Sequence, residues 1–183
     1  MEADTTLLQA ARRMDREALA QIFELYVRAL YNYAINLCHD RLMADYIVGN
    51  VFAKLVDQFC CGNGPTTNLR SYLFESAYHL IVDEVRYSYR RAPLDVVDVL
   101  LYADHSTALE AENRELFEQT LQVIQYQLTA YQRHVIFLRY MEGFSLRETA
   151  TILGKSVNII KAAQNRALGN LRKVLVSQQS KVQ

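Results

Sequence analysis

The residues best suited to chemistry lie near the C-terminal end, where amides, small side chains and cations share one face of a predicted helix. Gly154 accepts the left-handed conformation of a helix end, and Ser156 stands where an N-cap hydroxyl would start the next helix. The inward stripe of that helix recurs at spacings of three and four, at Val157, Ile160, Gln164, Ala167, Leu171 and Val174. Its opposite face and flanks carry Asn158, Lys161, Ala162, Asn165, Arg166, Gly169, Arg172 and Lys173.

This polar face has the composition of a surface that reads duplex DNA. Amides can hydrogen-bond to base edges, cations can hold phosphates, and small residues permit close approach. A shorter helix predicted over residues 146–153 precedes the glycine, so the two helices together predict a helix-turn-helix. The candidate residues for contacts with the duplex are Lys155, Ser156, Asn158, Lys161, Ala162, Asn165, Arg166 and Lys173.

The distribution of charge favours an anionic partner for this end of the chain. The formal net charge is zero, but residues 120–183 contain nine Lys and Arg against two Asp and Glu. Residues 92–119 contain one against seven, and residues 1–91 contain ten against eleven. A basic helix that is simply solvated is the alternative, and charge alone would favour it. The helix-turn-helix spacing shifts the interpretation to nucleic-acid binding.

Composition argues against several other classes of protein. An apolar share of 51% over 183 residues can bury the cores of one large or two small domains. No apolar run approaches the ~18 residues of a membrane span, and no basic-then-apolar signal begins the chain, so we expect a cytoplasmic protein. Cys38, Cys60 and Cys61 fit neither a disulfide framework nor a zinc site. Without a Gly-rich phosphate loop or a histidine beside a nucleophile, we expect no cofactor, no metal and no enzymatic activity.

The pattern of apolar residues predicts an all-α chain of two small helical domains joined by a linker, the second domain being the helix-turn-helix. Helical spacing predicts helices over residues 16–38, 41–59, 68–91 and 107–127, and a further one that starts at Thr129. Two glycines, an asparagine and a proline predict a loop over residues 60–67. Residues 92–106 show no clear periodicity, so we assign domains to residues 1–91 and 107–183 and the linker to 92–106.

The outward face of the predicted helix over 68–91 mixes rings with charged groups. Its members are Tyr72, Glu75, His79, Arg86 and Arg90. Single-stranded DNA binding needs this mixture, because bases stack on rings and phosphates pair with cations. The alternative is that the tyrosines form the rim of a hydrophobic core, which is the commoner role of a tyrosine on an amphipathic helix.

Both halves of the chain resemble the extracytoplasmic-function sigma factors, the smallest members of the principal sigma-factor superfamily. Residues 128–154 resemble the fourth conserved region of the family, and Ser156, Lys161 and Arg166 fall where that region places its recognition helix. Residues 44–52 resemble the helix that grips RNA polymerase. Residues 69–83 resemble the helix that opens the promoter.

The resemblance implies an alternative sigma factor that directs RNA polymerase to specific promoters. The first domain would dock on the polymerase core and capture the minus-ten element as a single strand, and the second would bind the minus-thirty-five element. An anti-sigma factor is a further implied partner. The implied polymerase-binding residues are Asp45, Tyr46, Gly49, Asn50 and Phe52. The candidate minus-ten contacts are Asn63, Arg70, Tyr72, His79, Arg86 and Arg90.

Two alternatives remain open. Tyr46, Gly49 and Asn50 stand where the family usually has acidic residues and a glutamine, which is consistent with a sigma-like DNA-binding transcription regulator with weakened polymerase docking. A helical adaptor that binds a protein through the apolar side chains of residues 92–106 is the other alternative. Capture of RNA polymerase separates the first two hypotheses, and salt-dependent DNA binding separates both from the adaptor.

Overall fold

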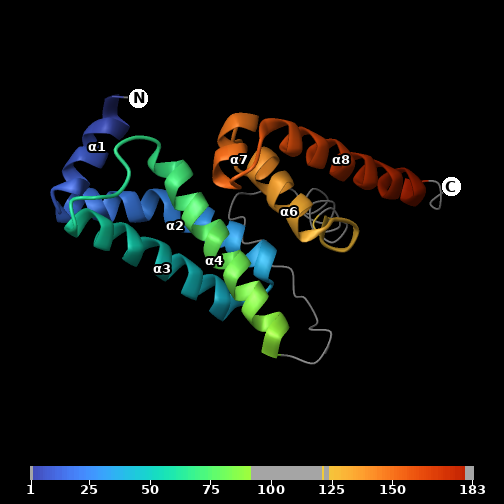
Figure 1. Cartoon of the computed structure of the whole chain (residues 1–183), viewed down its shortest axis with the longest axis horizontal. Coiled ribbons are helices and arrows are strands. Elements are labelled where there is room, and N and C mark those ends of the chain that lie inside the picture. Colours follow the sequence, from blue (N-terminus) through green and yellow to red (C-terminus); the bar gives the residue numbers. More distant parts are fainter. Residues whose placement is uncertain (1, 92–120, 122–123, 180–183) are drawn as a thin grey trace. The chain divides into compact units, whose positions relative to one another are not determined.

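The structure is a computed structural model that describes residues 2–91, 121 and 124–179 (Figure 1). The chain divides into two compact units, Met1–Val97 and Asp98–Gln183. All regular structure in the described residues is helical, which confirms the predicted all-α class. No described helix is long and apolar enough to cross a membrane. The predicted linker, and most of the helix predicted over 107–127, lie outside the described residues.

The first unit contains four described helices: α1 (Glu2–Arg12), α2 (Arg16–Cys38), α3 (Arg41–Cys60) and α4 (Leu69–Arg91). Asp15 caps α2 by accepting a hydrogen bond from the Ala18 N–H at 2.8 Å. Asp40 caps α3 in the same way, accepting from the Met43 N–H at 3.1 Å. His39, in the left-handed region at φ 57°, ends α2 and allows the sharp turn into α3. The last three helices match the predicted ones to within one residue at each end.

The helices α2, α3 and α4 pack on one another around the core of this unit. The rings of Tyr33 and Phe74 meet edge to face with their centroids 5.3 Å apart. The other large side chains that are fully buried in this core are Ile22, Leu30, Ile47, Leu55, Leu73 and Ile81. Burial of each such side chain contributes roughly 1.5–3 kcal/mol to the free energy of folding. The faces that carry these side chains therefore turn inward, and the opposite faces of the helices remain exposed.

The helix α1 is a feature that the sequence analysis does not predict. Its fully buried side chains among those described are Leu8 and Ala11, which are too few to produce a clear helical period. The helix nevertheless packs against α2 and α3. Its last residue, Arg12, reaches the loop between α3 and α4, so α1 contributes to that loop as well as to the core.

Several apolar residues at helical spacing are not fully buried, namely Leu19, Phe23 and Tyr26 of α2, Phe52 of α3 and Leu80 of α4. Phe23 of α2 is 46% exposed, and its ring packs on that of Phe52 of α3, with the centroids 4.8 Å apart. Leu80 of α4 is half-buried, whereas its neighbour Ile81 is 1% exposed. The helical spacing alone therefore overestimated the width of the buried stripes.

The second unit contains the described helices α6 (Ala130–Ile136), η1 (Phe137–Met141), α7 (Leu146–Ile152) and α8 (Val157–Gln179). Thr129 and Gln132 form a capping box at the start of α6, and Ser145 and Glu148 form another at the start of α7. The helix predicted to start at Thr129 and the helix-turn-helix pair are confirmed. The core that joins these helices contains Val135, Leu138, Phe144, Ile152, Leu153, Ile160 and Ala167.

Candidate nucleic-acid and polymerase interfaces

The turn between α7 and α8 has the geometry predicted for a helix-turn-helix. Gly154 has φ 59°, a conformation that glycine adopts without steric cost. The Lys155 N–H donates to the Ala150 carbonyl at 2.9 Å, which closes the end of α7. Ser156 then caps α8 as predicted, since its hydroxyl oxygen accepts from the Ile159 N–H at 3.4 Å. The turn thus determines the direction in which α8 leaves α7.

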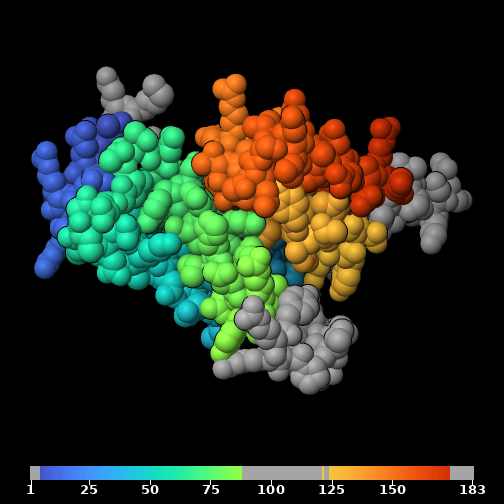
Figure 2. Space-filling view, viewed as in Figure 1, coloured from blue at the N-terminus to red at the C-terminus, as the bar shows by residue number. Residues whose placement is uncertain are grey.

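The polar face of α8 is open to solvent, as its composition requires for contact with DNA. Ile160 and Ala167 are fully buried and hold the helix, which packs on α6 and α7. Figure 2 shows the side chains of α7 and α8, coloured orange to red, as one continuous surface. The predicted contacts on this face are exposed except for half-buried Ala162: Lys155, Ser156, Asn158, Lys161, Asn165, Arg166 and Lys173. Their cations form no ion pair with any residue that the structure describes, so their charge is available to phosphates.

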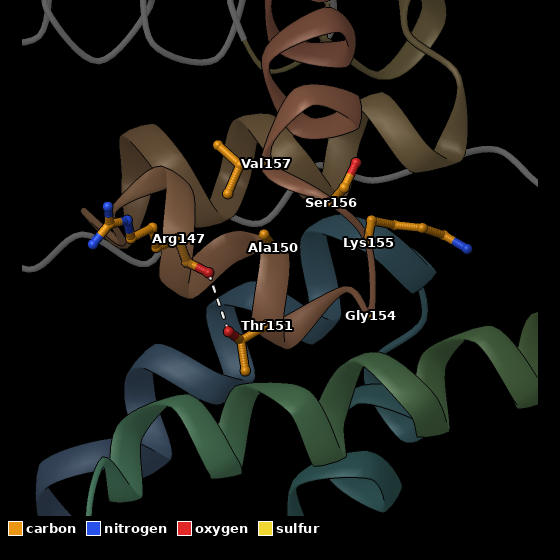
Figure 3. A pocket seen from close by; sticks show the side chains of 7 residues that line it. All are labelled: Arg147, Ala150, Thr151, Gly154, Lys155, Ser156 and Val157. Carbon is orange, nitrogen blue, oxygen red and sulfur yellow. Dashed lines mark hydrogen bonds between the residues drawn. The ribbon is translucent and has the colours of Figure 1, made fainter.

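An open hollow lies where the turn joins the two helices (Figure 3). It is lined by Arg147, Ala150, Thr151, Gly154, Lys155, Ser156 and Val157. The cationic side chains of Arg147 and Lys155 extend from opposite sides of it, and the Thr151 hydroxyl donates to the Arg147 carbonyl at 3.2 Å. Two cations beside the N–H groups that begin α8 suit a phosphate oxygen. Arg147 is a candidate that the sequence analysis missed, although its place on the first helix of the motif was an available signal.

The loop between α3 and α4 carries the polar candidates of the first unit. The side chains of Asn63, Thr66, Thr67 and Asn68 are exposed. Gly62, Gly64 and Asn68 all have positive φ, at 73°, 91° and 51°, so the loop turns tightly. Its exposed amides and hydroxyls can donate and accept hydrogen bonds to the edge of an unpaired base.

The outward face predicted for α4 is only partly open. His79 and Arg86 are exposed, and His79 Nε2 lies 4.0 Å from the Glu75 carboxylate. Tyr72 is instead half-buried with a buried hydroxyl, and burial raises the pKa of its phenol. Tyr72 is therefore less open than the outward face was expected to be, and its contact with DNA stays a prediction. One turn further along α4, Ser76 is buried, so half-buried Tyr72 lies beside the inward stripe.

The cations at the two ends of α4 have different surroundings. Arg70 is half-buried, and its guanidinium carbon lies 5.6 Å from the centroid of the Phe74 ring, which orients it along the start of the helix. The backbone of Arg90 belongs to α4, and its side chain lies outside the described part of the chain. Arg86 is thus the exposed cation toward the end of α4 for which the structure describes the side chain.

The predicted polymerase-binding residues occupy one side of α3. Asp45, Tyr46 and Gly49 are exposed, and Asn50 and Phe52 are half-buried. At 100° per residue these positions span a continuous arc of the helix, opposite the buried side chains. The Phe23 ring of α2 extends this arc, since it packs on Phe52 and remains 46% exposed. We refer to these six residues as the α2–α3 patch, and Phe23 is the member that the sequence analysis missed.

The described residues also include a buried histidine and three cysteines. Burial, with a smaller effect of nearby Arg133, lowers the pKa of His134 from 6.5 to about 3, so this imidazole is neutral inside the second unit. None of the three cysteines, all of them within the described residues, forms a disulfide; Cys60 and Cys61 are exposed and Cys38 is half-buried. No group of three or more His, Cys, Asp and Glu side chains in the described part of the chain could hold a metal ion.

The fold and the α7–α8 surface define a helical protein with a helix-turn-helix DNA-binding unit. Residues 126–173 match the family described as Sigma-70, region 4. The ECF RNA polymerase sigma factor SigX of Bacillus subtilis is 26% identical over 167 residues, which cover 86% of this chain and 83% of SigX. The ECF RNA polymerase sigma factor SigD of Mycobacterium tuberculosis is 30% identical over 112 residues, which cover 58% of this chain and 51% of SigD.

A solved structure has the same fold over almost the whole chain. CnrH, in complex with the cytosolic domain of CnrY, superposes with a TM-score of 0.71 at 20% identity, covering 96% of this chain and 98% of CnrH. The region 4 match and the sequence relatives identify this chain as an extracytoplasmic-function sigma factor, which confirms the resemblance seen in the sequence.

Proposed function

We propose that this chain acts as an alternative sigma factor: it binds the RNA polymerase core, recognises specific promoters and initiates transcription from them. The observation that carries this proposal is the exposed face of amides and unpaired cations on α8, within the stretch that matches sigma region 4. The chain would make and break no bond itself, because the chemistry belongs to the polymerase. It would act in the cytoplasm, together with the polymerase.

In this proposal α8 reads the minus-thirty-five element in the major groove. Asn158, Lys161, Asn165 and Arg166 lie on the exposed face and have the donors and acceptors that base edges require. Lys155 and Arg147, which flank the hollow at the turn, would hold the phosphate backbone and so set the register of the helix. Each good bidentate contact to a base would contribute roughly 1–3 kcal/mol of discrimination.

The first unit would supply the remaining two contacts of a sigma factor. The loop between α3 and α4 would capture a base of the minus-ten element, with Asn63 at its exposed edge and Arg70, His79, Arg86 and Arg90 along α4. Because Tyr72 is half-buried, we assign it a supporting role under the single strand rather than an open stacking platform. The α2–α3 patch would dock on the polymerase, with the Phe23 and Phe52 rings providing the apolar area.

An anti-sigma factor is the proposed inhibitory partner. The structural support is a likeness to the sigma factor RpoE, whose solved structure is a complex with the anti-sigma factor NepR from Bartonella quintana. This chain superposes on RpoE with a TM-score of 0.69 at 22% identity, over 85% of this chain and 95% of RpoE. Such a partner would prevent polymerase docking by covering the same surfaces.

Direct measurement of polymerase binding separates this proposal from the two alternatives. The full chain, immobilised through one end, is expected to retain purified core RNA polymerase, and it is expected to bind duplex DNA with an affinity that falls steeply with salt. DNA binding without polymerase retention would indicate the sigma-like regulator. Polymerase-independent protein binding with salt-insensitive DNA affinity would indicate the adaptor.

A further inference from the structure

The guanidinium of Arg12, at the end of α1, is surrounded by backbone carbonyls of the loop between α3 and α4. Its terminal nitrogens donate to four successive residues, namely Gly62 at 3.3 Å, Asn63 at 3.2 Å, Gly64 at 3.0 Å and Pro65 at 3.0 Å. The same group lies 6.0 Å from the centroid of the Phe59 ring at the end of α3. One side chain from the start of the sequence therefore contacts the backbone of a loop 50 to 53 residues away.

The conformation of this loop requires a hydrogen-bond donor such as the Arg12 guanidinium. Gly62 and Gly64 have φ of 73° and 91°, and glycine loses more conformational freedom on ordering than any other residue. Carbonyl oxygens that converge on one point repel each other unless donors lie between them. The planar fork of an arginine, with five N–H groups and a fixed charge, can satisfy several converging acceptors, whereas an ammonium group lacks this geometry.

The backbone of Asn63 is held by this arrangement. Its backbone carbonyl accepts from Arg12 at 3.2 Å, and its backbone N–H donates to the Gln58 carbonyl at 2.8 Å. Both backbone groups of Asn63 are thus held from the inside of the loop, which leaves its exposed amide on the outside. Arg12 itself is half-buried beneath the loop and is not placed to read a base.

We propose that Arg12 is a positioning residue for minus-ten recognition, which holds the loop of residues 62–65 in its DNA-binding conformation before the DNA arrives. This inference rests on the proposed function, because it assumes that the loop captures a base of the single strand. It gives α1 a role beyond packing. A loop ordered in advance spares the complex the conformational entropy of ordering it, so loss of Arg12 is expected to weaken single-strand binding by about tenfold or more.

Three variants of the full chain test this role. Arg12→Ala removes the donor, and Arg12→Lys keeps the charge but not the fork. Arg13→Ala is the matched control, since Arg13 is the exposed neighbour on the same turn and makes none of the contacts to the loop. Thermal unfolding of each variant first establishes that the first unit remains folded. Binding of a duplex by the second unit gives an internal reference that the inference predicts to be unchanged.

The first measurement is hydrogen–deuterium exchange of the free protein. The N–H groups of Gly62 and Asn63 donate to the carbonyls of Phe59 and Gln58 at the end of α3, at 3.0 and 2.8 Å, so their exchange reports the opening of the loop. We expect exchange at these amides to accelerate about tenfold or more in Arg12→Ala and Arg12→Lys, and to stay unchanged in Arg13→Ala. Exchange as slow in Arg12→Lys as in the unaltered chain would overturn the role of the guanidinium fork.

The second measurement is the affinity of the holoenzyme for single-stranded DNA. The probe is a fluorescent single strand selected from a random pool by core polymerase bound to the unaltered chain. We expect both Arg12 variants to bind it about tenfold or more weakly, with duplex binding unchanged. Equal affinity of the Arg12→Ala and unaltered holoenzymes would overturn the inference alone. An unaltered holoenzyme that selects no single strand would instead overturn the proposed function, and the inference with it.

Discussion

Arg139 of η1 and Gln164 of α8 are joined by a hydrogen bond of 3.0 Å from the arginine Nε to the glutamine Oε1. The same guanidinium donates through Nη1 to the carbonyl of Phe144, just before α7. The Arg139 side chain thus connects α8 by hydrogen bonds to the segment that precedes the helix-turn-helix. The π-helical turn of η1 carries Arg139, in keeping with the frequent occurrence of such turns at functional sites.

Arg139→Ala is expected to loosen α8 rather than to remove a contact with DNA. Loss of two part-buried, charge-assisted hydrogen bonds would lower the free energy of unfolding of the second unit by roughly 1–3 kcal/mol. Duplex affinity would fall for all sequences alike, because the whole reading face shifts. Arg172→Ala, which changes an exposed arginine of α8, is the control and should leave stability unchanged. Chemical denaturation and duplex binding provide the two readouts, and an Arg139→Ala protein as stable as the unaltered chain would contradict the account.

Arg166 and Lys173 are expected to have different roles, although both are exposed cations of α8. Arg166→Ala would lower the free energy of discrimination for the preferred base by roughly 1–3 kcal/mol and would broaden the set of sequences that are bound. Lys173→Ala would weaken binding to all sequences alike. It would also reduce the slope of log affinity against log salt concentration by about the value of one phosphate contact. Selection of bound duplexes from a random library measures both effects. An unaltered sequence preference in Arg166→Ala would remove this residue from base reading.

Phe23 is expected to contribute to polymerase docking through its exposed ring on Phe52. Phe23→Ala would remove apolar area from the α2–α3 patch and weaken core polymerase binding by roughly 1–3 kcal/mol. Leu25→Ala is the matched control, because Leu25 is 59% exposed but lies two residues further along α2, on nearly the opposite side of the helix. Titration of labelled core polymerase decides the question, and equal losses in the two variants would argue against a specific patch.

The stability of the second unit is expected to fall in mild acid because of His134. Its pKa is about 3 in the folded chain and 6.5 in the unfolded chain, so the unfolded state binds an extra proton between these values. The stabilisation is complete above pH 6.5 and is lost as the pH falls toward 3, at ~1.4 kcal/mol per pH unit. Denaturant titrations across this pH range measure the free energy of unfolding, which should change less with pH in His134→Gln than in the unaltered chain. The pH dependence of stability should persist in His79→Gln, which changes an exposed histidine. An equal pH dependence in the unaltered chain, His134→Gln and His79→Gln would contradict the role of His134.

Much of this fold could be predicted from the sequence, because its long helices carry local signals. Asp15 and Asp40 are good N-caps, and the Gly154–Ser156 turn has the residues that a helix-turn-helix requires. These are interactions between near neighbours in the chain. The helix bounds and the exposure of most of the α8 face follow from them.

The remaining features depend on contacts between distant residues. The bonds of Arg12 to residues 62–65 and the Arg139–Gln164 bond have no local pattern, so the sequence shows neither. The half-burial of Tyr72 depends on how α4 is rotated against its neighbours, which a helical period defines only to within one residue. The partial exposure of Phe23 likewise reflects how far α3 covers α2 at that point.

Run-off transcription with purified core RNA polymerase tests the central claim most directly. The template is a library of duplex fragments, and the comparison is core polymerase with and without the full chain. The account predicts transcripts that require the chain, from templates that share two sequence elements upstream of the start site. With Arg166→Ala, the transcribed templates should no longer share the element farther from the start site. A folded chain that binds duplex DNA yet yields no transcript above core polymerase alone would contradict it, and would identify the sigma-like regulator instead.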